Sequence, residues 1–311
     1  MNCVPETVDA IALYGSAVRT DFDRYSDRDV LLVSDDNDAL FQTKAALTEE
    51  GYSCSCYSWG KLDLLAAKKA LFIQHLKQES QIVLDRDNRL LSFLAGYSPA
   101  SSYSDQIQLT RSLIALTENF VDTQKGIGWA LDVLAVGLRN LAILTLANEG
   151  KYIFALPGLL SELKKMGQIS SEHECRLMEL RRFKSHFRHK RYHLLPTREV
   201  VFGLQKIIGQ SFDVAFEPMV MSREAFQYAC LHSKKAREMT NWYAQARLCE
   251  GAFMTLDKSI VSRSSSMWSR LQRIEDAIEN PSCYNFLFAN CARDLREDLA
   301  NLIDVVNLKA A

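Results

Sequence analysis

The sequence contains few of the residues that interrupt helices. Its 311 residues include 13 glycines and six prolines, and so few helix breakers favour a helix-rich fold. The sequence also lacks a dominant charge, because 37 lysines and arginines face 38 aspartates and glutamates. A net charge of −1 excludes a protein that coats polyanions with its whole surface. Any site for nucleotides or nucleic acid must therefore be a local patch.

Metal-binding cysteine motifs, a leader and a long apolar run are missing as well. No two cysteines have CxxC spacing and none lies at ligand spacing from a histidine, so neither structural zinc nor a redox motif is indicated. The first residues, MNCVPETVDAIALYG, lack the basic start of a signal peptide. The longest apolar run, residues 134–147, contains Arg139 and Asn140 and is too short to span a membrane. We expect a cytoplasmic protein without a membrane partner.

The sequence pattern changes near residue 100. Short β-rich runs at residues 10–14, 30–34, 52–59 and 81–84 alternate with helical stretches at 38–50 and 61–78. After the serine-rich segment GYSPASSYSD, apolar residues recur at the i, i+3, i+4 spacing of helices. The expected helices there cover residues 105–121, 128–148, 155–166, 171–186, 198–208, 222–248, 266–278 and 284–308. We predict an α+β fold in which a small mixed-sheet domain, residues 1–100, precedes a larger all-α helical bundle domain, residues 101–311.

Chemistry is concentrated in residues 13–36, LYGSAVRTDFDRYSDRDVLLVSDD. The first expected strand ends just before Gly15 and Ser16, where glycine permits close backbone approach and a helix beginning there would aim N–H groups at an anion. Asp27 and Asp29 precede the next strand, and side chains two residues apart share a strand face. Paired carboxylates repel unless something holds them together. A hard cation such as Mg²⁺, bound by carboxylates and substrate phosphates, would do so.

Gly-Ser, a spacer and Asp-x-Asp before an apolar strand resemble the nucleotidyltransferases of the DNA polymerase β superfamily. The forms G-S-x-x-R and S-D-x-D-V are most similar to its minimal nucleotidyltransferase branch, over about residues 8–95. The resemblance implies a nucleoside triphosphate (NTP) as substrate and one or two Mg²⁺ ions as cofactor. It also implies site residues: Asp27 and Asp29 as catalytic metal ligands, Gly15 and Ser16 at the β- and γ-phosphates, Arg19 as a phosphate or structural cation, and Ser26 in the nucleotide site.

One feature departs from this family. Its members usually carry a third carboxylate on the following strand, whereas residues 52–59, YSCSCYSW, contain no acid. Asp63 lies beyond that strand. Three interpretations stay open: another acid serves as the base, the reaction proceeds without one, or the domain binds nucleotide without turnover.

A basic cluster stands out in the helical part. Residues 181–193, RRFKSHFRHKRYH, contain six lysines and arginines, interleaved aromatic residues and no acid. Such a cluster suits phosphates and stacked bases, although a solvated helix face with core aromatics would show the same pattern. Minimal nucleotidyltransferases often occur with HEPN helical bundles, whose ribonucleases carry R-x4-6-H, and the pair Arg188 and His193 fits that spacing. The acceptor or phosphate contacts expected from this cluster are Arg181, Arg182, Lys184, Arg188 and His193.

Together these features predict a Mg²⁺-dependent nucleotidyltransferase. It would move a nucleoside monophosphate (NMP) from an NTP to a hydroxyl of a protein, an RNA or a small molecule, and the resemblance suggests a toxin–antitoxin or phage-defence setting. RNA would bind through residues 181–193, and a homo-oligomer is compatible with the sequence. One alternative is a nucleotide-sensing or partner-binding module with reduced catalysis. The other is a HEPN-type ribonuclease that uses Arg188 and His193.

Overall fold

The computed structural model describes residues 7–19, 28–234, 236, 242–256, 266–279 and 288–310. The chain divides into two compact units. The first comprises Met1–Ser104 and Ala142–Leu163, and the second comprises Asp105–Leu141 and Lys164–Ala311. These units differ from the predicted domains at residues 101–104 and 142–163, and the division into domains stays a prediction.

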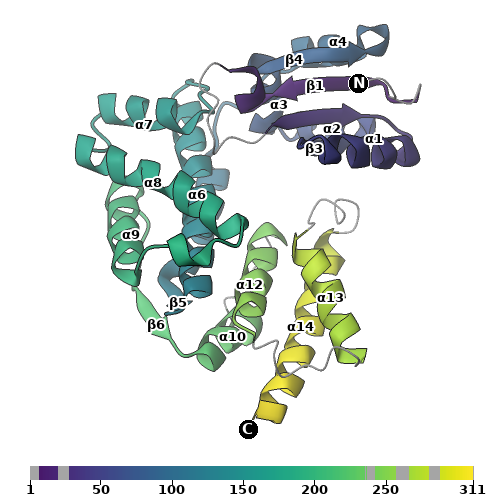
Figure 1. The fold of residues 1–311 in the computed structure, drawn as a ribbon. Helices are drawn as coiled ribbons and strands as arrows, with labels where there is room; N and C mark the ends of the chain where they lie inside the picture. The colour runs from purple at the N-terminus through teal and green to yellow at the C-terminus, as the bar shows by residue number, and fades with distance from the viewer. Residues whose placement is uncertain are drawn as a thin grey trace. The chain divides into compact units, whose positions relative to one another are not determined.

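A four-stranded mixed sheet forms the centre of the first unit (Figure 1). Its strand order is β3-β2-β1-β4. β1 pairs antiparallel with β2 and β4, whereas β2 and β3 are parallel. The strands are β1 (Ala10–Tyr14), β2 (Asp29–Val33), β3 (Ser53–Tyr57) and β4 (Ser80–Asp85). All four lie where the sequence predicted strands, and the predicted α+β class is confirmed at the level of a small mixed sheet accompanied by many helices.

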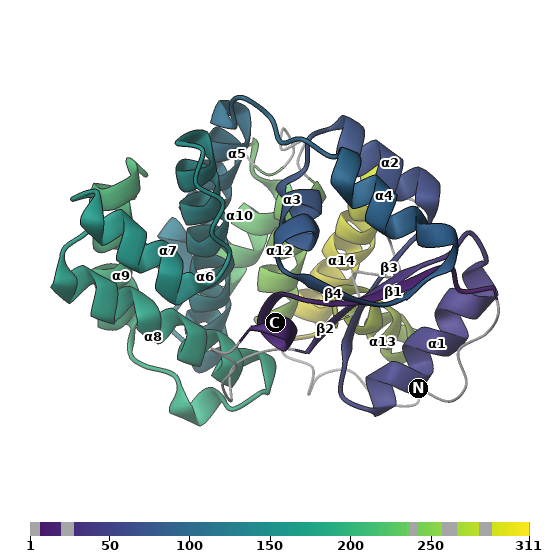
Figure 2. The ribbon, with the colours of Figure 1, turned by 90° about the horizontal axis from the view of Figure 1, so that it is seen from above.

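Helices cover both faces of this sheet, with α1 on one side and α2 and α4 on the other (Figure 2). Alternate residues of a strand point to opposite faces, so Val30 and Leu32 pack with α1 while Leu31 and Val33 pack with the other helices. α1 also connects the parallel strands β2 and β3, as such a crossover requires. The helices are α1 (Asn37–Glu49), α2 (Trp59–Ala67), α3 (Leu71–Gln78) and α4 (Arg89–Gly96).

Polar caps explain where α1 begins and ends. The carboxylate of Asp36 accepts hydrogen bonds from the main-chain N–H groups of Asp38 and Ala39, which an N-cap residue does for an otherwise unpaired first turn. These bonds lower the pKa of Asp36, the one to Ala39 contributing most. At the other end Gly51 has φ +84°, a conformation that favours glycine after a helix.

Two local expectations in the first unit are wrong. The predicted helix over residues 61–78 is two helices, because Lys69 has φ +54°. The hydroxyl of Tyr97 donates to the carbonyl of Ala70, the residue before the second helix, at 2.8 Å. The helix expected to open at Gly15 is instead the 3-10 turn η1 (Gly15–Val18), after which Arg19 is extended. Sequence periodicity does not report such breaks, because they depend on side chains from elsewhere in the fold.

The second unit is built around α6 (Gln124–Asn148), whose residues up to Leu141 belong to it. α6 is long and apolar enough to cross a membrane, but 78% of its most apolar stretch is buried inside the protein, as in a core helix. The predicted helix over residues 105–121 ends early. α5 (Ser104–Ile114) is followed by a 3-10 turn, η3 (Ala115–Glu118), and by β5 (Asn119–Val121), which pairs in parallel with β6 (Met219–Met221).

The remaining helices follow the predicted periodicity with shifted ends. The single helix expected over residues 222–248 is not continuous, because α10 ends at His232 and Ser233 is extended. The described part of the last expected helix begins at Phe288. The elements are α7 (Leu156–Lys165), α8 (Ser171–Arg188), η4 (Tyr192–Leu194), α9 (Arg198–Phe212), α10 (Arg223–His232), α12 (Trp242–Met254), α13 (Ser266–Glu279) and α14 (Phe288–Ala310).

Candidate functional site

The end of β1 and the start of β2 bring Gly15 next to Asp29. Antiparallel pairing places Asp29 directly across from Tyr14, the residue before Gly15. A Cβ atom added to Gly15 would lie 3.6 Å from Oδ2 of Asp29, so the buried glycine lies directly beside a half-buried carboxylate. The predicted partners Ser26 and Asp27 lie outside the described residues.

Gly15 itself is held in place through Glu79. Its φ of +62° is a conformation that side chains with a Cβ rarely adopt. Its N–H donates to the main-chain carbonyl of Glu79 at 3.0 Å, because β4 begins one residue later. The N–H of Gly15 is therefore already used within the fold, and the expected phosphate contacts of this turn fall on Ser16 and the residues that follow.

The side chain of Glu79 joins two further groups at this turn. Nη1 of Arg19 lies 2.5 Å from Oε2 of Glu79, and Nε2 of His75 lies 3.2 Å from the same oxygen. Burial raises the pKa of Glu79, but hydrogen bonds from His75 and Arg19 and their charges outweigh it and hold this pKa below its ordinary value. Of the two roles expected for Arg19, phosphate cation or structural cation, this ion pair fits the structural one.

His75 completes the wall of the site. Its ring stacks on Phe154 with centroids 4.4 Å apart and meets the ring of Tyr14 edge-on. Its Nε2 would lie 3.5 Å from a Cβ on Gly15. Sequence analysis did not single out His75 or Glu79. The only signal was their i, i+4 spacing near the end of a helix, which many surface pairs share.

β3 presents hydroxyls where the family that the sequence resembles usually has its third acid. In the parallel pairing Ser53 lies across from Asp29, and the Ser55 hydroxyl is 2.9 Å from that of Tyr14. Asp63, the acid noted beyond this strand, is exposed on α2. Apart from Asp29, the acid that the described residues place at this turn is Glu79, and it is paired with Arg19 and His75.

The described residues of this site could hold a Mg²⁺ ion only together with further ligands. Within the residues that the structure describes, no three His, Cys, Asp or Glu side chains lie close enough together to hold a metal. Asp29 supplies one hard oxygen ligand beside Gly15. Mg²⁺ is usually held by one or two carboxylates together with substrate phosphates, so Asp29 with Asp27 and a triphosphate would fit.

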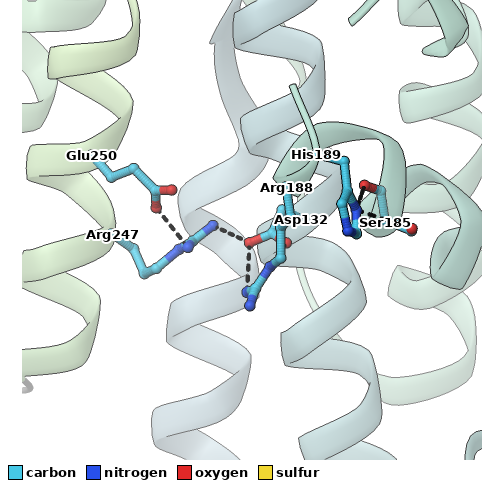
Figure 3. A network of polar contacts seen from close by, with 6 residues as sticks. All are labelled: Asp132, Ser185, Arg188, His189, Arg247 and Glu250. Carbon is cyan, nitrogen blue, oxygen red and sulfur yellow. Dashed lines mark hydrogen bonds and ion pairs between the residues drawn. The ribbon is translucent and has the colours of Figure 1, made fainter. Parts of the chain in front are cut away.

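A buried ion network lies under the basic cluster in the second unit (Figure 3). The Asp132 side chain is 1% exposed, and Arg188 and Arg247 converge on it. Arg188 donates from Nε at 2.7 Å and from Nη2 at 3.2 Å, while Arg247 donates from Nη2 at 2.6 Å. Arg247 also pairs with Glu250 at 2.5 Å. These contacts tie together α6, α8 and α12.

Ionisation in this network follows from burial and charge. Burial raises the pKa of Asp132, but the charges of Arg247 and Arg188 prevail and lower it. For Glu250, burial prevails over the charge of Arg247, and its pKa is raised. Arg188 thus has a charged partner in the core although its own side chain is 48% exposed.

The cluster at residues 181–193 divides into buried rings and exposed cations. Phe183 and Phe187 are 5% and 6% exposed, so these two rings follow the second interpretation of the cluster and pack in the core. Arg182 pairs with Glu179 on the same helix. Arg181 and Lys184 are half-buried, whereas His193 is exposed in η4.

No protein-family model, curated protein or solved structure matches the chain significantly. The resemblance to nucleotidyltransferases therefore stays a prediction that depends on the residues of the Gly15 turn and the Asp-x-Asp motif.

Proposed function

We propose that this chain is a Mg²⁺-dependent nucleotidyltransferase that transfers NMP from an NTP to an acceptor hydroxyl. The observation that supports it most is the contact between Gly15 and Asp29. The family that the sequence resembles holds its triphosphate at such a glycine turn beside a carboxylate, and Mg²⁺ is usually held by carboxylates together with substrate phosphates. The acceptor belongs to a protein, an RNA or a small molecule, in a toxin–antitoxin or phage-defence setting.

Each residue has a defined task in this proposal. Gly15 lets the triphosphate approach the backbone, Ser16 contacts its phosphates, and Asp27 and Asp29 hold Mg²⁺. The bound ion neutralises phosphate charge and orients the triphosphate. The acceptor oxygen forms a bond to the α-phosphorus, the bond to the bridging oxygen breaks, pyrophosphate leaves, and the hydroxyl proton passes to solvent. Solvent takes the proton because β3 carries serines at the place where the family that the sequence resembles has a carboxylate.

Those same serines favour a second candidate, a module that binds nucleotide without turnover. The third candidate, a HEPN-type ribonuclease, receives less support. Its arginine would have to stabilise a phosphorane, whereas Arg188 already donates two hydrogen bonds to Asp132.

The test is label transfer from each α-³²P-NTP, with Mg²⁺ or with EDTA, to total protein, RNA and a panel of small-molecule acceptors. Asp29→Asn and Asp27→Asn keep the side-chain size and remove the ligand charge, so both should abolish transfer. Asp63→Asn, which makes the same charge change at an exposed position of α2, should leave it intact. Nucleotide binding without label transfer in the native chain would replace the transferase with the binding module.

A further inference from the structure

The end of α8 is an exposed basic turn, which we define as residues 188–193. All of its residues except Tyr192 are exposed, and among them are Arg188, Lys190 and Arg191. No acid occurs between Glu179 and Glu199. In a chain of net charge −1, such a local excess of cations sets up a positive field at this one place.

The backbone of the basic turn has one defined conformation. The N–H of Lys190 donates to the carbonyl of Phe187 at 2.9 Å, and that of Arg191 donates to His186 at 2.8 Å, the two bonds of a Schellman helix end. Lys190 has φ +56°, where glycine is the usual residue because a Cβ is strained there. A lysine therefore occupies a position at which glycine would make a more stable turn.

The turn is also attached firmly to the core. Arg188 reaches from it to the buried Asp132, and the ring of Tyr192 packs against Phe187 with centroids 6.0 Å apart. Tyr192 therefore packs inward, while Lys190, Arg191 and the imidazoles of His189 and His193 are exposed. The outward surface combines two lysine and arginine charges with two histidine rings.

We propose that the basic turn binds the phosphate backbone of a nucleic-acid strand and that this strand carries the acceptor hydroxyl. The second half of this statement rests on the proposed function; the first does not. Lys190 and Arg191 contact phosphates, which carry no sequence information, so binding depends strongly on salt and little on base sequence.

The composition of the surface favours a polyanion over an acidic protein or a membrane. Protein interfaces are centred on buried aromatic and aliphatic anchors, and membrane-surface helices present an apolar face. In the basic turn and the residue that follows it, the one large exposed apolar side chain is Leu194. Exposed cations along a short turn suit closely spaced phosphates instead.

The test is a fluorescence-anisotropy titration of the full chain with labelled 20-nucleotide strands, without NTP or Mg²⁺, over a series of salt concentrations. One arm uses unstructured RNA and the other uses single-stranded DNA of the same sequence, which distinguishes the two sources of the backbone. The variant is Lys190→Gly with Arg191→Gln. Removing two phosphate contacts should weaken binding roughly tenfold and reduce the salt slope by about 1.4, since each contact contributes about 0.7 for single strands.

The variant also separates binding from folding. Lys190→Gly relieves backbone strain, so the chain should melt at the same or a higher temperature while it binds less tightly. A matched control, Lys206→Ala with Lys61→Ala, removes two cations elsewhere, one from α9 and one from α2, and should bind like the native chain. Asp29→Asn should also bind normally, so a failed transferase assay would leave the binding half of this inference standing.

Three results would overturn the proposal. They are no binding of either strand at low salt, an unchanged salt slope in the basic-turn variant, and displacement of the strand by polyglutamate at equal charge, which would assign the surface to an acidic protein.

Discussion

Gly15 and Glu79 are linked through the main chain, where the N–H of Gly15 donates to the carbonyl of Glu79 at 3.0 Å. The side chain of the same glutamate pairs with Arg19 and His75. Glu79 therefore holds the turn that would receive a triphosphate at both its glycine and its arginine. A residue remote in sequence positions the site that the sequence motif identifies.

Replacing Glu79 should destabilise the protein in a pH-dependent way. Glu79→Gln weakens the bonds to Arg19 and His75, and a hydrogen bond to a charged group contributes about 1.5–3 kcal/mol. Because the pKa of Glu79 is lowered on folding from 4.5, the native chain has this stability above pH 4.5 and loses it as the pH falls through the folded value. Urea unfolding from pH 3 to 7 should show the two proteins converging at low pH. Glu49→Gln, at an exposed position of α1, should show no such trend.

A methyl group added to Gly15 has room, but the backbone conformation of this residue disfavours any side chain. The nearest atoms to an added Cβ are 3.4 Å away or more, which is ordinary contact, whereas φ +62° strains an alanine. Gly15→Ala should cost about 1–2 kcal/mol of unfolding free energy, measured by urea denaturation. Gly60→Ala lies in α2 with open space around it and should instead stabilise the protein by up to about 1 kcal/mol. Equal effects at the two glycines would show that strain at Gly15 is absent.

Asp132 should be among the most sensitive positions of the second unit. Asp132→Asn removes the carboxylate that Arg188 and the buried Arg247 share and leaves Arg247 with Glu250 alone, and breaking a buried pair costs about 3–5 kcal/mol. Asp122→Asn breaks an ion pair with Arg198 in which both side chains are at least 40% exposed, and should cost less than about 1 kcal/mol. Thermal unfolding of the two variants measures the contrast. A loss at Asp132 no larger than the loss at Asp122 would contradict the structural role of the network.

A carboxylate restored to β3 should strengthen metal binding if the proposed function is right. Ser53 lies across from Asp29 on the parallel strand, so Ser53→Asp adds an oxygen ligand on the same face of the sheet. Mg²⁺ should then bind several-fold more tightly in calorimetric titration with a non-hydrolysable NTP analogue present. Ser53→Asn, which adds similar bulk without charge, serves as control. Unchanged Mg²⁺ affinity in the aspartate variant would place the ion away from Asp29.

The local sequence was sufficient for the elements that depend on local rules. Short β-rich runs located all four strands of the first unit and the helical stretch at 38–50 located α1, because strand preference and the caps at Asp36 and Gly51 act within a few residues. The Gly-Ser and Asp-x-Asp pattern likewise pointed to one edge of the sheet. Gly15 and Asp29 do meet there.

Tertiary structure alone decided which distant groups meet. The attachment of Glu79 to Gly15 and Arg19 follows from the register between β1 and β4, and the capture of Arg188 by Asp132 follows from the packing of α8 on α6. The burial of Phe183 and Phe187 likewise removed two rings from the surface that the basic cluster presents. The sequence does not show whether such a residue faces solvent or the core. Burial and charge pairing arise only when distant parts of the chain pack together.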